Sequence, residues 1–220
     1  MKQSLLPNQE RARFVLIMMR IHIVFEALTL ALYLYTYQIL NQDGPMGSME
    51  IDNYRLALIT VFLLPYLSFG LLIVSAIAFV RWMSRGYDNY SMASGSGLFE
   101  RSSVLWAFFL PFINLARPYN IVQEMWEGMQ IRLSQTVKSS LIGWWWTFWI
   151  GNFILRLILI GSDKVYIFNI LISVFSIIAA FLVIRIVKRY SGFEKERVQY
   201  LRIEDLENRE NLGEYHSPDF

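Results

Sequence analysis

Three of the ionisable residues that lie within long apolar runs of the chain could do chemistry together: His22, Glu26 and Arg156. His22 and Glu26 are four residues apart, a spacing that puts both side chains on one face of a helix. Charged groups are costly in an apolar environment, so they usually pair with one another or serve a function. Glu26 and Arg156 can therefore form a structural ion pair. Two alternatives stay open: Arg156 reaches the surface with its long side chain, or the three residues mark a path for protons or ions.

A second set of polar residues surrounds two prolines between residues 109 and 126. Pro118 suits the first turn of a helix, and a helix N-terminus attracts anions. Arg117, just before it, offers a planar fork for a phosphate, so we expect an anionic lipid headgroup here. In the alternative, Arg117 pairs with Glu124 or only follows the charge bias of membrane proteins. The predicted lipid or ligand-binding residues are Asn114, Arg117, Tyr119, Glu124 and Trp126.

Several other chemistries lack the residues that they need. The 220 residues include no Cys and only two His, which leaves no disulfide and no set of metal ligands. The signatures Gly-x-Ser-x-Gly and His-Glu-x-x-His are both missing from the sequence. We therefore expect no cofactor and no metal, and an enzyme is disfavoured although this class stays open. The formal charge of +2 gives no case for nucleic acid as a partner.

The elements that must position these residues are predicted to be membrane helices. Hydrophobic residues make up 55% of the chain and charged residues 17%, where soluble domains have about 25% charged residues. A helix needs about 20 mainly apolar residues to cross a bilayer. Four runs reach that length, at residues 14–40, 56–80, 141–160 and 165–187. The predicted fold class is an all-α integral membrane protein with four transmembrane helices.

Two shorter segments between the second and third spans complete the predicted fold. The apolar run 104–116 would reach only about 20 Å at 1.5 Å per residue, so we expect a short re-entrant or broken helix. Residues 118–133 place apolar and acidic side chains on different sides, which is typical of an interfacial amphipathic helix. The transmembrane domain is thus expected to cover residues 1–187, followed by a charged tail at 188–220.

The distribution of basic residues predicts the orientation. Four crossings place 15 Lys and Arg residues on one side and only Arg55 and Lys164 on the other. Because cytoplasmic loops are the basic ones, both termini are expected in the cytoplasm. The tail carries 6 basic and 8 acidic residues, and a membrane-protein partner is expected to dock there if one exists.

The segment at residues 109–126 has the pattern Phe-x-Pro-x-x-Asn-Leu-x-Arg-Pro-Tyr followed by Glu-x-Trp. Together with Arg81-Trp82 before it and the Trp-rich span from Gly143 after it, this pattern resembles a bacterial membrane-protein family, domain of unknown function 4328. The resemblance covers roughly residues 55–187. It implies a multi-span protein of the bacterial cytoplasmic, or inner, membrane, and it implies no activity and no catalytic residues.

Two classes of function follow from these patterns. The favoured one is a non-enzymatic membrane component that binds lipid, which the segment at 104–133 would contact, or another membrane protein. The alternative is a small channel or carrier for an ion or small solute, because His22, Glu26 and Arg156 lie at membrane depth. At 1.5 Å per residue, Glu26 and Arg156 lie about 18 and 22 Å from the inner ends of their spans.

Overall fold

The protein is built from helices, as the sequence predicts. The computed structural model describes residues 5–42, 51–94, 116–130, 139–161 and 164–214, and no strand occurs in these ranges. The helices are α1 (Gln9–Gln42), α2 (Ile51–Leu58), α3 (Leu64–Ser94), α5 (Arg117–Gly128), α6 (Ser140–Leu159) and α7 (Val165–Glu214), with a π-helical turn, η2 (Ile59–Leu63), between α2 and α3.

Four stretches of helix are long and apolar enough to cross a membrane, which confirms the predicted number. Within the most apolar window of each stretch, between 11% and 39% of the residues are buried inside the protein. Most of the apolar side chains therefore face outward, where a bilayer would cover them. The chain is accordingly a membrane protein. The four stretches are Gln9–Ile39, Arg55–Ser94, Ser140–Leu159 and Val165–Asn208.

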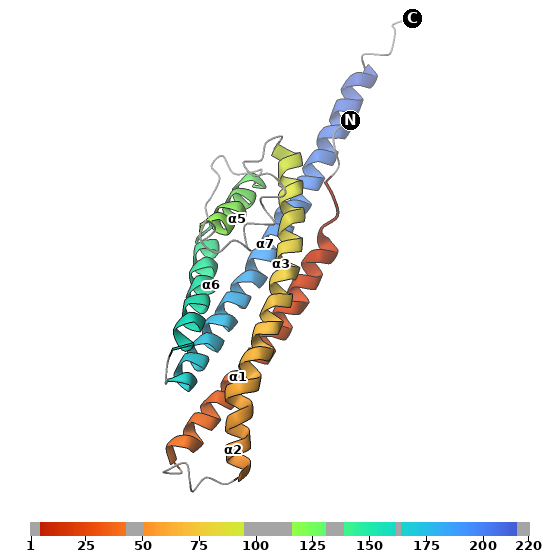
Figure 1. Ribbon diagram of the computed structural model, residues 1–220. Coiled ribbons are helices and arrows are strands. Elements are labelled where there is room, and N and C mark those ends of the chain that lie inside the picture. Colours follow the sequence, from red (N-terminus) through yellow and green to blue (C-terminus); the bar gives the residue numbers. More distant parts are fainter. Residues whose placement is uncertain (1–4, 43–50, 95–115, 131–138, 162–163, 215–220) are drawn as a thin grey trace, which may run out of the picture.

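The long helices form an elongated bundle (Figure 1). α7 packs against both α1 and α6, and α1 also packs against α3. The short helix α5 contacts α3 and α6 near the end of the bundle at which α3 finishes. At the other end, α1 and α2 extend past the turn that joins α6 to α7 (Figure 1). The bundle thus has one end at which α5 packs beside the longer helices and one end formed mainly by α1 and α2.

A proline explains the π-helical turn in the second membrane helix. Pro65 has no N–H group, so it cannot make the hydrogen bond that a regular helix would form with the carbonyl of Val61. The chain widens just before it into η2, which is a common local adjustment in such helices. Thr60 lies in this turn, donates a hydrogen bond to the carbonyl of Leu56 at 2.6 Å and shares a second one with Thr36 at 3.3 Å. η2 therefore remains joined to α1.

The last membrane helix and the tail form one continuous helix, because α7 runs without a break through the expected boundary at residue 187. Residues 165–214 contain no proline, and Gly192 alone costs a helix only about 1 kcal/mol. Tyr190 is fully buried, and its hydroxyl donates to the carbonyl of Gly86 at 2.9 Å. The first turns of the predicted tail therefore pack against α3.

The predicted interfacial helix corresponds to α5, but its apolar side faces protein. Val122, Trp126 and Met129 are 0%, 4% and 1% exposed. The sequence pattern shows only that one side of this helix is apolar and not whether lipid or protein covers that side. Residues 104–115 of the expected re-entrant segment at 104–116, and residues 131–133 of the expected interfacial helix, lie outside the described residues.

Candidate functional site

Two of the three predicted intramembrane residues come together on α1, beside α3. Glu26 is fully buried, and His22 is 2% exposed. Ser68 of α3 donates a short hydrogen bond from its hydroxyl to Glu26 Oε1. His22 Nε2 lies 4.0 Å from the same carboxylate oxygen. As the four-residue spacing predicts, His22 and Glu26 share one face of α1, and both side chains face the interior of the bundle.

Arg156 reaches this group from α6. Its Nη2 group donates to the hydroxyl of Ser68 at 3.4 Å, and its Nε group donates to Asn152 Oδ1 at 2.9 Å. The amide of Asn152 in turn donates to Ser176 Oγ at 2.7 Å and to the carbonyl of Ile172 at 2.9 Å, both on α7. We call His22, Glu26, Ser68, Asn152 and Arg156 the intramembrane cluster. It links all four membrane helices.

The expected pairing of Glu26 with Arg156 takes an indirect form. The two residues reach one site, but the described residues contain no direct ion pair between them, and Ser68 stands between the two charges. Neither Ser68 nor Asn152 was predicted from the sequence to belong to this site. Both are polar residues within apolar runs, which was the sign that the sequence offered. Choosing them among the other Ser and Asn residues requires knowing which faces of α3 and α6 point into the bundle.

Three polar atoms of this region have no hydrogen-bond partner among the described residues. They are Glu26 Oε2, His22 Nδ1 and Ser75 Oγ, and each is buried. Buried polar groups usually have a partner, so orphaned ones are candidates for contact with water or a ligand. His22 and Ser75 both line a cavity of about 330 Å³.

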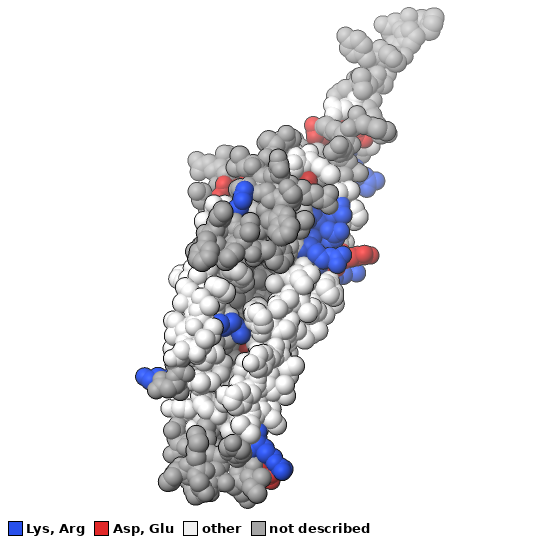
Figure 2. All heavy atoms as spheres, in the orientation of Figure 1, with Lys and Arg blue, Asp and Glu red and all other residues white. Residues whose placement is uncertain are grey.

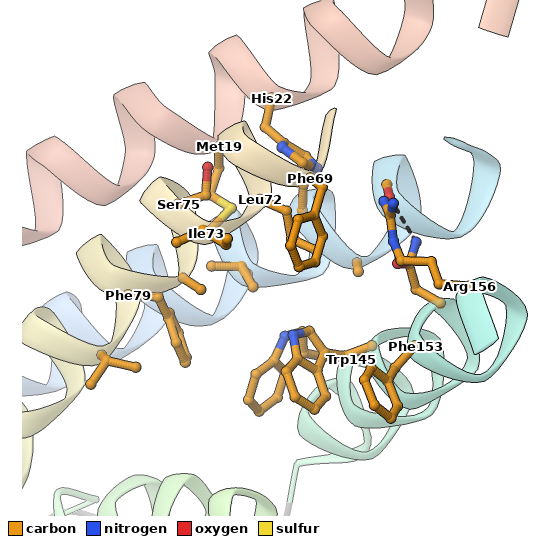
Figure 3. Close-up of a pocket in the computed structure, with 18 residues that line it drawn as sticks. Met19, His22, Phe69, Leu72, Ile73, Ser75, Phe79, Trp145, Phe153 and Arg156 are labelled. Atoms are coloured by element: carbon orange, nitrogen blue, oxygen red, sulfur yellow. Dashed lines mark hydrogen bonds between the residues drawn. The ribbon is translucent and has the colours of Figure 1, made fainter. Parts of the chain in front are cut away.

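This cavity, which we call the lateral cavity, lies between α3 and α6, with α7 and α1 behind it (Figure 3). Its walls are mostly apolar and include Phe79, Trp145 and Phe153, while Arg156 lies at its polar end (Figure 3). The guanidinium of Arg156 also lies 5.8 Å from the centre of the Phe69 ring. In the space-filling view, the apolar face is hollowed between α3 and α6 (Figure 2). The cavity therefore opens to the side of the bundle.

Some of the predicted lipid-binding residues between 109 and 126 hold α5 in place. Glu124 accepts a hydrogen bond from the Tyr87 hydroxyl at 3.3 Å, which ties α5 to α3. Trp126 packs edge-on against Phe193 of α7, with ring centres 5.0 Å apart. Its indole is thus covered by protein. Arg117 and Tyr119 are half-buried at the start of α5, and Asn114 lies outside the described residues. The lipid site at Arg117 stays a prediction.

A further polar group lies where α3 meets α7. We call Asn8, Asn89 and Glu194 the junction cluster. Asn89 accepts a hydrogen bond from Leu6 N at 2.8 Å and donates to Leu6 O at 3.0 Å and to Glu194 Oε1 at 2.9 Å. Asn8 also donates to Glu194 Oε1, at 3.1 Å. Since the partners are 83 to 186 residues apart in the chain, no local pattern indicates this contact.

The sequence profile of a family described as Domain of unknown function (DUF4328) matches residues 48–192. The chain belongs to the DUF4328 family. The DUF4328 match covers α3, α5 and α6 and includes Ser68, Asn89, Asn152 and Arg156, whereas His22, Glu26 and Glu194 lie outside it. No curated protein and no solved structure matches the chain.

Proposed function

We propose that this protein is a non-enzymatic membrane component that binds an amphiphilic lipid molecule in the lateral cavity. The observation that carries the proposal is a cavity of about 330 Å³ with apolar walls and one arginine at its end. Ligand pockets typically have about 300–1,000 Å³, mostly apolar walls and a few polar groups that orient the ligand. An acyl chain would fill the apolar part, and a polar or anionic headgroup would contact Arg156.

The hydrogen bonds of Arg156 favour such a headgroup. A guanidinium has five N–H donors, and with the described residues Arg156 forms hydrogen bonds through Nε and Nη2. Its Nη1 group is therefore available to a phosphate or carboxylate. Arg156 precedes the end of α6 by only a few residues, or about 5 Å along the helix axis. A headgroup at Arg156 would thus lie close to the membrane surface, with its acyl chain directed along α3 towards Phe79.

A substitution that fills the lateral cavity tests the proposal and leaves the residues of the intramembrane cluster unchanged. Ala76 lines the lateral cavity, so Ala76→Phe is expected to reduce covalent capture of a diazirine-bearing palmitic acid by about tenfold, equivalent to 1.4 kcal/mol. Ala27→Phe is the matched control, because Ala27 is exposed on the lipid-facing side of α1. Captured peptides identified by mass spectrometry should come from α3 and α6. Equal capture by the wild type and both variants would refute binding in this cavity.

The proposed location is the bacterial inner membrane, with both termini in the cytoplasm. Its support is the excess of Lys and Arg that four crossings place on one side. Figure 2 shows basic side chains gathered near the N-terminal end of α1 and the adjoining part of α3. Because the chain has no Cys, single substitutions can be labelled without background. From outside intact cells, Ser48→Cys should react with an impermeant maleimide and Ser94→Cys should not. The reverse pattern would overturn the orientation.

We also propose that a membrane-protein partner binds the tail, which is the part of α7 beyond residue 187. Val198, Ile203 and Leu206 are 49%, 55% and 54% exposed on the part of α7 beyond its apolar run. Apolar side chains in water favour contact with another protein. We expect a membrane-protein partner to co-purify with the wild type from native membranes and to be lost from a Val198→Glu/Ile203→Glu variant. Identical co-purification profiles would remove the tail from the proposal.

A carrier or channel for protons is the second candidate, and one feature of α1 favours it. Five buried polar residues follow a single face of this helix: His22, Glu26, Thr29, Tyr33 and Thr36. A continuous polar stripe at membrane depth is typical of proton relays. Purified protein in liposomes should then dissipate a pH gradient, and Glu26→Gln should abolish the flux. A wild-type rate equal to that of empty liposomes would exclude this function.

A further inference from the structure

A second cavity lies at the junction cluster, far from the lateral cavity. Its volume is about 810 Å³, and no residue lines both cavities. The N-terminal segment, α3 and α7 together form its walls, so three separate parts of the chain contribute. We call it the junction cavity. The residues used below are Glu10, Arg11, Arg85, Ser191, Glu194 and Lys195.

The walls of the junction cavity carry three cations, Arg11, Arg85 and Lys195, against two carboxylates, Glu10 and Glu194. Glu194 does not neutralise these cations directly. It is 8% exposed, and its Oε1 atom accepts hydrogen bonds from the amides of two asparagines at 2.9 and 3.1 Å. Among the described residues, no ion pair joins Glu194 to Arg85 or Lys195. An anion that enters the cavity would therefore meet two cations, Arg85 and Lys195, that form no ion pair with the described residues.

Arg85 is the residue that points most clearly to a ligand. It makes no hydrogen bond and no ion pair with any described residue, and its Nε atom is buried without a partner. Ser191, which also lines the cavity, has a buried hydroxyl without a partner. A half-buried guanidinium without a partner is unusual, because an unsatisfied charged donor is costly. Arg11, by contrast, already donates to the carbonyl of Arg81 at 3.2 Å.

The position of the cavity suits a phosphate. Ser191 and Glu194 lie four and seven residues beyond Val187, where the apolar run of α7 ends, or about 6–10 Å along the helix. This is the depth of lipid headgroups. The planar fork of an arginine binds phosphate through two parallel hydrogen bonds, and a nearby lysine adds a point charge.

We propose that the junction cavity binds the phosphate group of an anionic ligand, held chiefly by Arg85 and Lys195. The phosphate belongs either to the headgroup of an anionic phospholipid in the adjacent leaflet or to a soluble phosphate compound. Both sources share the same recognition chemistry, and the experiment has one arm for each. The proposal does not rest on the lateral cavity, so Ala76→Phe should leave phosphate binding unchanged.

The lipid arm uses nanodiscs that contain phosphatidylcholine with or without phosphatidylglycerol. Native mass spectrometry should show that the wild type retains phosphatidylglycerol in preference, and that Lys195→Glu reduces this retention by about tenfold, or 1.4 kcal/mol. Lys195 is exposed, so its reversal should not impair folding. Lys188→Glu is the matched control, because Lys188 is exposed on the same helix and does not line the cavity.

The soluble arm measures the thermal shift that inorganic phosphate or pyrophosphate produces in detergent that contains no anionic lipid. A shift in the wild type and in Lys188→Glu that is lost in Arg85→Gln and Lys195→Glu assigns the cavity to a soluble phosphate compound. Lipid retention without such a shift assigns it to a headgroup. If Lys195→Glu and Arg85→Gln match Lys188→Glu in both arms, the junction cavity is not a phosphate site.

Discussion

The protein buries two carboxylates, and the comparison of their surroundings separates a charged site from a structural one. Glu26 faces the opposite charge of Arg156 across a single serine hydroxyl, and its Oε2 atom has no partner among the described residues. Glu194 instead receives its hydrogen bonds from the neutral amides of Asn8 and Asn89. One carboxylate depends on a charge and the other on amide donors.

This difference shows how the two clusters relate to stability and function. In the junction cluster, amide donors connect the N-terminal segment, α3 and α7, so the cluster fixes where these parts of the chain lie. The intramembrane cluster also connects helices, and both clusters retain unpartnered polar atoms beside a cavity: Glu26 Oε2 and His22 Nδ1 in the intramembrane cluster, and Asn8 Oδ1 in the junction cluster. Strong unsatisfied groups in a low-dielectric site are costly for stability and useful for binding.

The same substitution at the two carboxylates should have very different effects. Glu26→Gln removes a charge that compensates Arg156, and an uncompensated buried charge typically costs about 3–5 kcal/mol. Glu194→Gln keeps an oxygen that accepts from both asparagines, so we expect a loss of less than about 1 kcal/mol. Thermal unfolding in detergent measures both.

The double variant Glu26→Gln/Arg156→Gln is the control for this comparison, because it removes both charges together. It should be less destabilised than Glu26→Gln alone. Losses that simply add would show that the two charges do not interact through Ser68, and equal losses at Glu26 and Glu194 would end the distinction drawn between the clusters.

The amide donors of the junction cluster provide the next test. Asn89→Ala removes three hydrogen bonds, two to the backbone of Leu6 and one to Glu194. At about 1 kcal/mol each, we expect a loss of 2–3 kcal/mol. Asn120→Ala, at an exposed position of α5, should change the unfolding temperature very little. An Asn89 variant as stable as this control would mean that the N-terminal segment is held elsewhere.

Two buried serines on α3 test whether Ser68 bridges the charges of the intramembrane cluster. Ser68 hydrogen-bonds to both Glu26 and Arg156, whereas the Ser75 hydroxyl has no partner among the described residues. Ser68→Ala should therefore cost about 1–2 kcal/mol, while Ser75→Ala should be neutral or slightly stabilising. Chemical or thermal unfolding of the two variants side by side measures this difference, and similar losses would contradict the bridging role of Ser68.

The smallest expected effect concerns the contact next to the junction cluster. Tyr190→Phe removes the hydrogen bond from the tyrosine hydroxyl to the carbonyl of Gly86 and keeps the ring in place. The expected loss is about 0.5–1.5 kcal/mol. Tyr200→Phe is a suitable reference, since Tyr200 is 48% exposed on the same helix. A Tyr190 variant indistinguishable from it would show that the packing of the Tyr190 ring, and not its hydroxyl, is what this residue contributes to the contact between α7 and α3.

The parts of the fold that follow from local patterns were predictable. The length of an apolar run is a property of consecutive residues, so the number of membrane helices could be counted from the sequence. The same is true of His22 and Glu26, which share a face of α1 because they are four residues apart. Arg156 reaches them only because α6 lies close enough to α3 for its guanidinium to contact Ser68, which no local pattern shows.

The parts that depend on the rotation and neighbours of a helix were not predictable. An aromatic residue on an apolar stripe can face lipid or protein, and the sequence does not show that Trp126 packs on Phe193. Nothing near Asn89 in the sequence indicates that its amide will hold the backbone of Leu6. Arg85 also looked like one more basic residue after a span, and only the folded chain shows that it lacks a partner.

The unbroken course of α7 has a mechanical consequence. Its part beyond Val187 continues as helix to Glu214, a length of about 40 Å at 1.5 Å per residue. A stiff rod of this length acts as a lever, so that a tilt of about 10° within the bilayer would displace its far end by roughly 7 Å. Small adjustments of the helices around Asn152 and Ser176 would thus be amplified into movements that a protein at the membrane surface can detect.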